Sequence, residues 1–110
     1  MISYFVNYDG QADDPQSFYD YYRDRHGEIL SRFEGISGLL LHRPVEWNDP
    51  FPVNKGSSSL IAQMKFDSQA ALDAALTSAA REEARRDFQN FPRFNGSVFH
   101  QAMKAEKVFG

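Results

Sequence analysis

Two kinds of hydrophobic pattern alternate along this chain, and their order constrains the fold more than any other feature. Four segments rich in β-branched and aromatic residues are typical of strands, which we expect at residues 2–8, 39–47, 59–67 and 97–108. Two others repeat apolar side chains every three or four positions, as amphipathic helices do, at residues 15–33 and 69–88. The order β-α-β-β-α-β predicts an α+β, ferredoxin-like fold, with two helices on one face of a four-stranded antiparallel sheet.

Capping and turn-forming residues set the expected boundaries of these elements. Asp14 and Ser68 stand where N-caps of the two helices belong, and Thr77-Ser78 is expected to break the second helix. Asp9-Gly10 signals a turn after the first strand. Pro44 cannot donate to a ladder, so its strand is expected at a sheet edge or with a bulge.

Two polar segments are conspicuous. Residues 48–58 contain Asn, Asp, Pro, Gly and Ser in a loop longer than the ~2–5 residues usual for hairpins, so we expect a mobile loop or a functional flap. The run from Arg81 to Asp87 mixes both signs of charge. Helical pairs such as Glu82 with Arg85 or Arg86 favour a solvated helix face over a recognition surface.

Composition excludes several classes of protein. The 110 residues fit one compact domain, and a formal charge of -3 leaves no basic excess for binding nucleic acid or an anionic membrane. No cysteine is present, so disulfides and thiolate chemistry are excluded. The N-terminal segment lacks a signal-peptide pattern, which makes the cytoplasm the expected location. Aromatic content is high, with ten Phe and five Tyr.

Three histidines are the natural candidates for proton transfer, because imidazole titrates near neutral pH. His26 lies on the apolar stripe of the first helix and should point toward the sheet, as a structural histidine or as a catalytic one. His42 and His100 are expected to be ordinary strand or surface residues. The three lie on different elements without ligand spacing, so no metal site and no cofactor are predicted.

Four sequence elements carry a family resemblance. The most specific of them has an aromatic residue four positions before a histidine. Together the four elements cover most of the chain: Phe18-x-x-Tyr21-Tyr22-x-x-x-His26, Gly35-Ile36-x-Gly38-Leu39, Ala62-x-Met64-x-Phe66-x-Ser68-x-x-Ala71-Leu72 and Phe91-Pro92-x-Phe94-x-Gly96. The pattern resembles the EthD-like family, known from ethyl tert-butyl ether degradation clusters, in the dimeric α+β-barrel superfamily. Gly27-Glu28-Ile29 stands where the family carries a proline, which leaves the helix less interrupted.

The resemblance implies a single domain over residues 1–110 that binds a small hydrophobic or aromatic metabolite between helices and sheet. One hypothesis is a cofactor-independent isomerase, cyclase, lyase or oxidoreductase-type enzyme of a degradation or secondary-metabolite pathway. In it His26 moves the proton, assisted by Tyr22 or Tyr4. The expected wall residues of the cleft are Tyr4, Phe18, Met64, Phe66 and Phe91. The alternatives are a non-catalytic binding or accessory protein to a neighbouring oxygenase, and a haem-binding relative.

Both faces of the predicted sheet carry apolar residues. Phe5, Leu40 and Ile61 alternate with the side chains that should face the helices. A second copy of the chain is the simplest cover for that face, and the resemblance implies the same arrangement. We therefore expect a homodimer in which two sheets close into a barrel.

Overall fold

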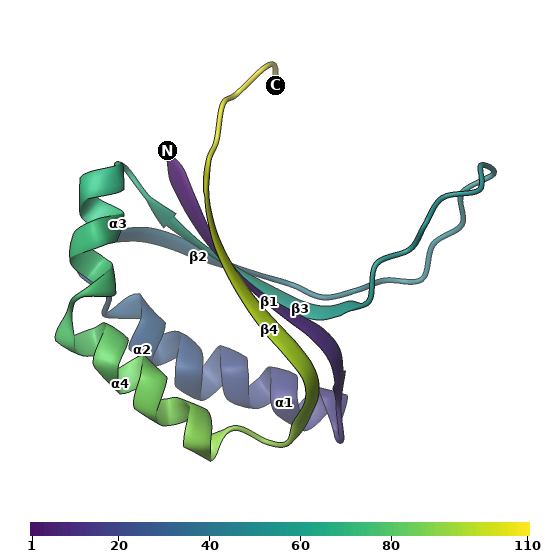
Figure 1. Cartoon of the computed structure of the whole chain (residues 1–110), viewed down its shortest axis with the longest axis horizontal. Helices are drawn as coiled ribbons and strands as arrows, with labels where there is room; N and C mark the ends of the chain where they lie inside the picture. The colour runs from purple at the N-terminus through teal and green to yellow at the C-terminus, as the bar shows by residue number, and fades with distance from the viewer.

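The computed structural model describes all 110 residues and confirms the predicted α+β, ferredoxin-like fold (Figure 1). Four antiparallel strands form one sheet in the order β2-β3-β1-β4. Their bounds are Ile2–Ala12 for β1, Ile36–His42 for β2, Ser58–Phe66 for β3 and Phe94–Lys104 for β4. β2, the strand that leads to Pro44, lies at an edge, as expected, and its register shift between Ile36 and Gly38 is at the end far from Pro44.

The helices all lie on one side of the sheet (Figure 1). The first comprises α1 (Pro15–Tyr21), a π-helical turn at Tyr22–His26 and α2 (Gly27–Ser31). The second is divided into α3 (Gln69–Leu76) and α4 (Ala79–Asp87), followed by a 3₁₀ turn at Phe88–Asn90. The side chains of Asp14, Ser68 and Ser78 accept hydrogen bonds from the first turns of α1, α3 and α4, which confirms both expected caps and the expected break.

The core lies between this helical layer and the inner face of the sheet. Alternate residues of the two central strands point into it, and most of them are almost completely buried: Tyr4, Val6 and Tyr8 from β1, and Leu60, Ala62, Met64 and Phe66 from β3. Phe18, Tyr22, Ile29 and Leu30 of the first helix meet them. The alternation seen in the sequence therefore identified the correct face of each central strand.

The turn expected at Asp9-Gly10 is wrong, because β1 continues to Ala12. Gly10 pairs with Gly96 of β4 in the antiparallel register. Both have positive φ, 139° and 153°, and a Cβ on Gly10 would lie 2.2 Å from the Asn95 carbonyl oxygen. Two glycines opposite each other let the strands approach closely at this point, so the residue that signals a turn here permits a longer ladder.

Three strand boundaries and one helix also differ from expectation. β2 ends at His42 rather than residue 47, because Pro44 cannot continue the ladder. β4 is shifted toward the N-terminus, to residues 94–104 rather than 97–108, since β1 is longer than expected and pairs with all of it. The first helix ends at Ser31, and its π-helical turn was not predicted.

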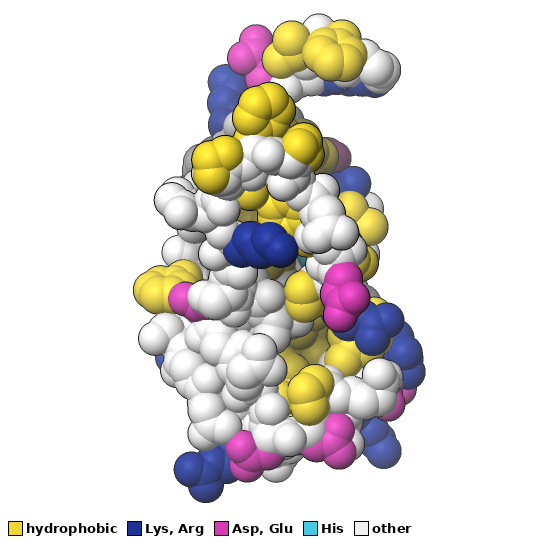
Figure 2. All heavy atoms as spheres, turned by 90° about the vertical axis from the view of Figure 1, so that its right-hand side faces the viewer, with side chains coloured by type: hydrophobic (Ala, Val, Ile, Leu, Met, Phe, Trp, Pro, Cys, Tyr) yellow, Lys and Arg dark blue, Asp and Glu magenta, His cyan; other side chains and the backbone are white.

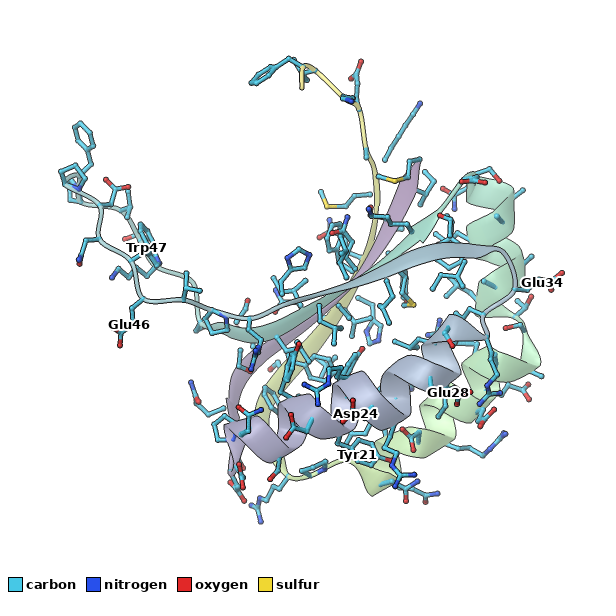
Figure 3. All side chains as sticks on the ribbon, turned by 180° about the vertical axis from the view of Figure 1, so that it is seen from behind. Tyr21, Asp24, Glu28, Glu34, Glu46 and Trp47 are labelled. Carbon is cyan, nitrogen blue, oxygen red and sulfur yellow. The ribbon has the colours of Figure 1, made fainter.

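Residues 43–57 form an arm that projects away from the body (Figures 1 and 3). Trp47 and Glu46 lie on it, far from the helices. Its apolar residues are exposed, among them Val45 and Phe51, and Figure 2 shows hydrophobic side chains gathered near its end. The arm begins where β2 ends and returns to β3, so it is the loop expected between these strands.

Backbone amides of the arm should exchange with solvent faster than those of any other internal segment. Between residues 48 and 56, only two N–H groups are bonded within the chain, that of Val53 to the Phe51 carbonyl and that of Phe51 to the Asp49 side chain. N–H groups that make no hydrogen bond within the chain become exposed to exchange at almost no cost in free energy. Hydrogen exchange followed by mass spectrometry measures this directly, and protection as strong as that of β1 would contradict it.

The outer face of the sheet is not covered by any helix. It carries Phe5 and Ile61 on the central strands and three exposed apolar side chains near the edges, Leu40, Phe99 and Met103. Phe99 is 56% exposed. None of the helices is long and apolar enough to cross a membrane.

Candidate functional site

His26 ends the π-helical turn of the first helix and is buried beneath it. Only 3% of the residue is exposed. A π-helical turn adds a residue to the helical register, and such turns are frequent at functional sites. Gly27 follows directly and donates its N–H to the Tyr22 carbonyl, and a Cβ at Gly27 would lie 3.2 Å from that oxygen. The turn therefore depends on a small residue after the histidine.

Three aromatic rings surround the imidazole of His26. The Phe91 ring meets it edge-on at 4.7 Å between centroids, the Tyr22 ring lies at 4.9 Å, and the Phe88 ring is stacked at 5.7 Å. These rings exclude water from most of the imidazole. They come from the first helix and from the segment after α4, so the site depends on packing between the two helical halves of the chain.

Asp87, the last residue of α4, accepts three hydrogen bonds. His26 Nδ1 lies 2.9 Å from one carboxylate oxygen, Oδ2. The Tyr21 hydroxyl donates to the other oxygen, Oδ1, at 2.7 Å, and Asn90 Nδ2 donates to it at 3.1 Å. Figure 3 shows Tyr21 on the first helix, whereas Asp24 and Glu28 lie on the outer surface of that helix. The carboxylate thus holds the imidazole in one orientation.

Electrostatics keep His26 neutral near pH 7. Burial lowers the pKa of His26 below its usual value, and the hydrogen bond and negative charge of Asp87 offset this only in part. Burial also tends to raise the pKa of Asp87, but the hydrogen bonds from His26, Tyr21 and Asn90 outweigh it and the pKa is lowered. An ionised Asp87 places the imidazole proton on Nδ1. The lone pair on Nε2 is then free to accept a proton.

A small cavity of about 20 Å³ adjoins His26 between the helices and the sheet. This volume is sufficient for a water molecule, since one needs roughly 10–15 Å³ by the same measure. Most of its lining is hydrophobic and comes from β1, the first helix, β3, α4 and β4: Tyr4, Val6, Tyr8, Tyr22, His26, Leu30, Phe33, Met64, Arg81, Ala84, Arg85, Phe88 and His100. A larger ligand has to displace side chains at the mouth.

Four of the seven site residues expected from the sequence meet at this cavity, namely His26, Tyr22, Tyr4 and Met64. The other three do not line it. Phe18 packs against Tyr8 and Phe94 in an aromatic cluster farther along β1, and Phe66 is fully buried in the core. Phe91 contacts the His26 ring but is not part of the cavity lining. All three bury large rings, and helical or strand periodicity does not distinguish core packing from a cavity wall.

Sequence reasoning missed Asp87 and its hydrogen bond with His26. The signal that could have found Asp87 is its helical spacing from Ala80 and Ala84, which places the three residues on one face of the helix. A carboxylate on an otherwise buried stripe requires a partner, and His26 is the buried donor that meets it. His100, expected to be an ordinary strand residue, also lines the cavity. No group of three or more His, Cys, Asp or Glu side chains comes together in a way that could hold a metal ion.

No protein-family model matches this chain, and no curated protein matches it by sequence. Solved structures do resemble it. An EthD family protein from Bacillus halodurans superposes with a TM-score of 0.76 at 18% identity, covering 96% of this chain and 99% of that one.

Two Streptomyces proteins are also similar in structure. SnoaB from Streptomyces nogalater, a cofactor-independent oxygenase, has a TM-score of 0.65 at 13% identity, with 97% of this chain and 94% of that one covered. The ActVA-Orf6 monooxygenase of Streptomyces coelicolor, in complex with nanaomycin D, has a TM-score of 0.67 at 12% identity, with 98% and 89% covered. At these identities the likeness establishes architecture. The chain has the ferredoxin-like α+β fold of the EthD family protein and of these two oxygenases.

Proposed function

We propose that this chain is an EthD-like protein that binds a small aromatic or hydrophobic metabolite in the cleft beside His26 and catalyses a proton transfer on it. The observation that carries the proposal is the buried His26–Asp87 pair, with 2.9 Å between Nδ1 and Oδ2. A structural histidine needs a hydrogen-bond partner, but it does not need to line a cavity as well, as His26 does. The pathway would be degradative or secondary-metabolic, in the cytoplasm, as the resemblance implies.

The chemistry follows from the protonation state. Neutral His26 accepts a proton at Nε2 from an acidic C–H or O–H of the ligand, and the electron pair of that bond stays on the ligand as an enolate or phenolate. Asp87 stabilises the imidazolium that forms. Return of the proton to another atom of the ligand gives an isomer. If the enolate carbon instead attacks a carbonyl carbon of the same ligand, the C=O π pair becomes an alkoxide that takes the proton from His26, which gives a cyclised product. Tyr22, whose ring lies beside His26, is the neighbouring group proposed to assist.

The neighbours in structure support this class of ligand. The Streptomyces coelicolor protein was solved with nanaomycin D, and SnoaB is described as acting without a cofactor. Both share the arrangement of helices over a sheet that creates the cleft in this chain. A cofactor-independent reaction relies on the protein's own acid or base, and His26 is the buried one here.

Substitution of His26 by glutamine should abolish turnover while ligand binding is retained. Native mass spectrometry of the purified protein identifies a co-purified ligand, and NMR in D₂O follows exchange of its acidic hydrogen. We expect His26→Gln to slow that exchange by about 10²–10⁴-fold, as loss of a general base does. His42→Gln, on the outer face of the sheet, is the matched control.

The same experiment separates an enzyme from a carrier. A non-catalytic binding or accessory protein would retain its ligand and show no exchange even in the wild type. Equal exchange by wild type and His26→Gln would remove the histidine from the reaction.

We also propose that the chain forms a homodimer through the outer face of its sheet. Phe5, Leu40, Ile61, Phe99 and Met103 make this face apolar, and some of its polar side chains bond to each other. Asn7 Oδ1 on the same face is buried without a hydrogen-bond partner. Gln63 donates to Ser3 at 3.0 Å and lies 3.0 Å from His42. Polar groups that already have partners, such as Gln63, lose little when water is removed from the face.

A further inference from the structure

One face of α4 overlooks the cavity beside His26. Arg81, Ala84, Arg85 and Phe88 follow each other at helical spacing, and all four line that cavity. Ala84 and Phe88 supply apolar surface near the bottom of the face. Arg81 and Arg85 place two guanidinium groups at the same cavity, whose lining is otherwise mostly hydrophobic.

Neither arginine has a carboxylate partner. The ion pairs expected between Glu82 and Arg85 or Arg86 do not form, because no oxygen of Glu82 lies within 4.0 Å of them. The other acidic residues of α4 are engaged elsewhere, Glu83 with Arg32 at 2.8 Å and Asp87 with His26. The two guanidinium groups therefore have no negative charge to neutralise them.

Aromatic rings hold these arginines near the opening. The Arg81 guanidinium lies 5.9 Å from the centroid of the Tyr4 ring, and that of Arg85 lies 5.3 Å from the Phe88 ring. Such cation–π contacts keep a guanidinium in place while leaving its N–H groups free to donate. The two guanidinium groups are thus already positioned at the opening in the absence of a ligand.

The strand on the other side of the opening offers no negative charge either. On β4, the residues that lie on the same inner face as Tyr4 and Val6 are Val98, His100, Ala102 and Lys104. Arg81, Arg85 and His100 line the same cavity, between α4 and β4. Desolvation and the positive charges of the two arginines lower the pKa of His100. His26 itself is paired with Asp87 and also lines the cavity.

We propose that the ligand of this cavity is an organic anion, an aromatic ring bearing a carboxylate, sulfonate or phenolate that sits between Arg81 and Arg85. This inference rests on the proposed function and adds the charge of the substrate to it. The ring would enter among Tyr4, Tyr22 and Phe88, and the acid group would remain at the mouth. Negative charge that develops when His26 removes a proton would be stabilised by the same two arginines.

Two dyes that differ by one sulfonate test this directly. 8-Anilino-1-naphthalenesulfonate is the anion, and N-phenyl-1-naphthylamine is the same ring system without the charge. Fluorescence titration of the wild type should give a Kd about 10- to 100-fold lower for the sulfonate, the range expected of charge-assisted hydrogen bonds. The double variant Arg81→Gln/Arg85→Gln should remove that preference and leave the affinity for the amine within about threefold. Arg86→Gln, on the same helix but outside the cavity lining, should change neither dye.

The ring resonances of the three histidines show where each dye binds. His26 and His100 should shift, whereas His42, on the outer face of the sheet, should not. Equal affinity for both dyes at His26 and His100, or a sulfonate preference that survives the double variant, overturns the anion inference and leaves the proposed cleft intact. If neither dye shifts His26 or His100, the cleft itself fails as a ligand site, and both proposals fall together.

Discussion

Replacement of Asp87 by alanine should lower the free energy of unfolding by about 1–3 kcal/mol, the cost of leaving one buried donor without a partner. Asp87 accepts from His26, Tyr21 and Asn90. Tyr21 and Asn90 are partly or largely exposed and can turn to water, but His26 is 3% exposed and cannot. The loss should therefore come mainly from the unpaired Nδ1–H of the imidazole.

Thermal unfolding measures this effect. In a chain of this size, a loss of that order lowers the melting temperature by roughly 5–15 °C. Asp24→Ala is the matched control, because Asp24 also accepts a hydrogen bond from a basic side chain, that of Arg23, but it is exposed on the outer surface of the first helix (Figure 3). Exposed pairs contribute about 0–1 kcal/mol. Equal melting temperatures for the two variants would show that the His26–Asp87 bond does not stabilise the fold.

The pH dependence of this contribution has a definite sign. The pKa of His26 is lower in the folded state than in the unfolded chain, so the unfolded chain takes up the proton first as the pH falls. The stability associated with neutral His26 is complete above the usual histidine pKa of about 6.5 and is lost as the pH falls below it. Asp87 keeps its contribution to lower pH, because its pKa is lowered and its loss begins only below the usual value for aspartate.

Sequence periodicity predicted the fold well because it reports which side of each element is buried. Tyr4, Val6 and Tyr8 had to share a face, and so did Leu60, Met64 and Phe66, whatever the exact ends of the strands. The ends depended on partners elsewhere in the chain. Gly10 suggested a turn until Gly96 lay opposite it, and the pairing of these two residues across 86 positions is not visible in either segment alone.

The candidate site was predictable only in part, for the same reason. His26 could be assigned to the inner stripe of the first helix from its spacing with Tyr22 and Ile29. Its partner Asp87 lies 61 residues away and belongs to a charged run that resembles a solvated surface. The spacing of Asp87 from Ala84 carried the relevant signal, but only the packing of α4 against α2 shows which donor it meets. Phe18 and Phe66 were expected in the cavity wall but lie in the core, because a core and a cavity wall use the same kinds of side chain.

A charge on the outer face of the sheet should convert a dimer of this chain into a monomer. Phe99 lies on the edge strand β4, on the apolar outer face and opposite Asn7 in the register, and is 56% exposed. In a twofold interface each copy contributes the same residue, so Phe99→Asp buries two unpaired carboxylates at once. Burial of a charge without a partner costs several kcal/mol, which is comparable to the whole net stability of a moderate interface.

Sedimentation equilibrium at micromolar concentration distinguishes the two states. We expect the wild type at twice the chain mass of 12.6 kDa and Phe99→Asp at the chain mass. Val98→Asp is the matched control, since Val98 is the preceding residue of β4, is also exposed and points to the opposite face. Two sheets of this kind would bury roughly 1,600 Å² or more, an area typical of stable complexes. If the wild type is a monomer at that concentration, the five apolar side chains of the outer face have no cover and the proposed homodimer is wrong. The proposal for the His26 site does not depend on this result.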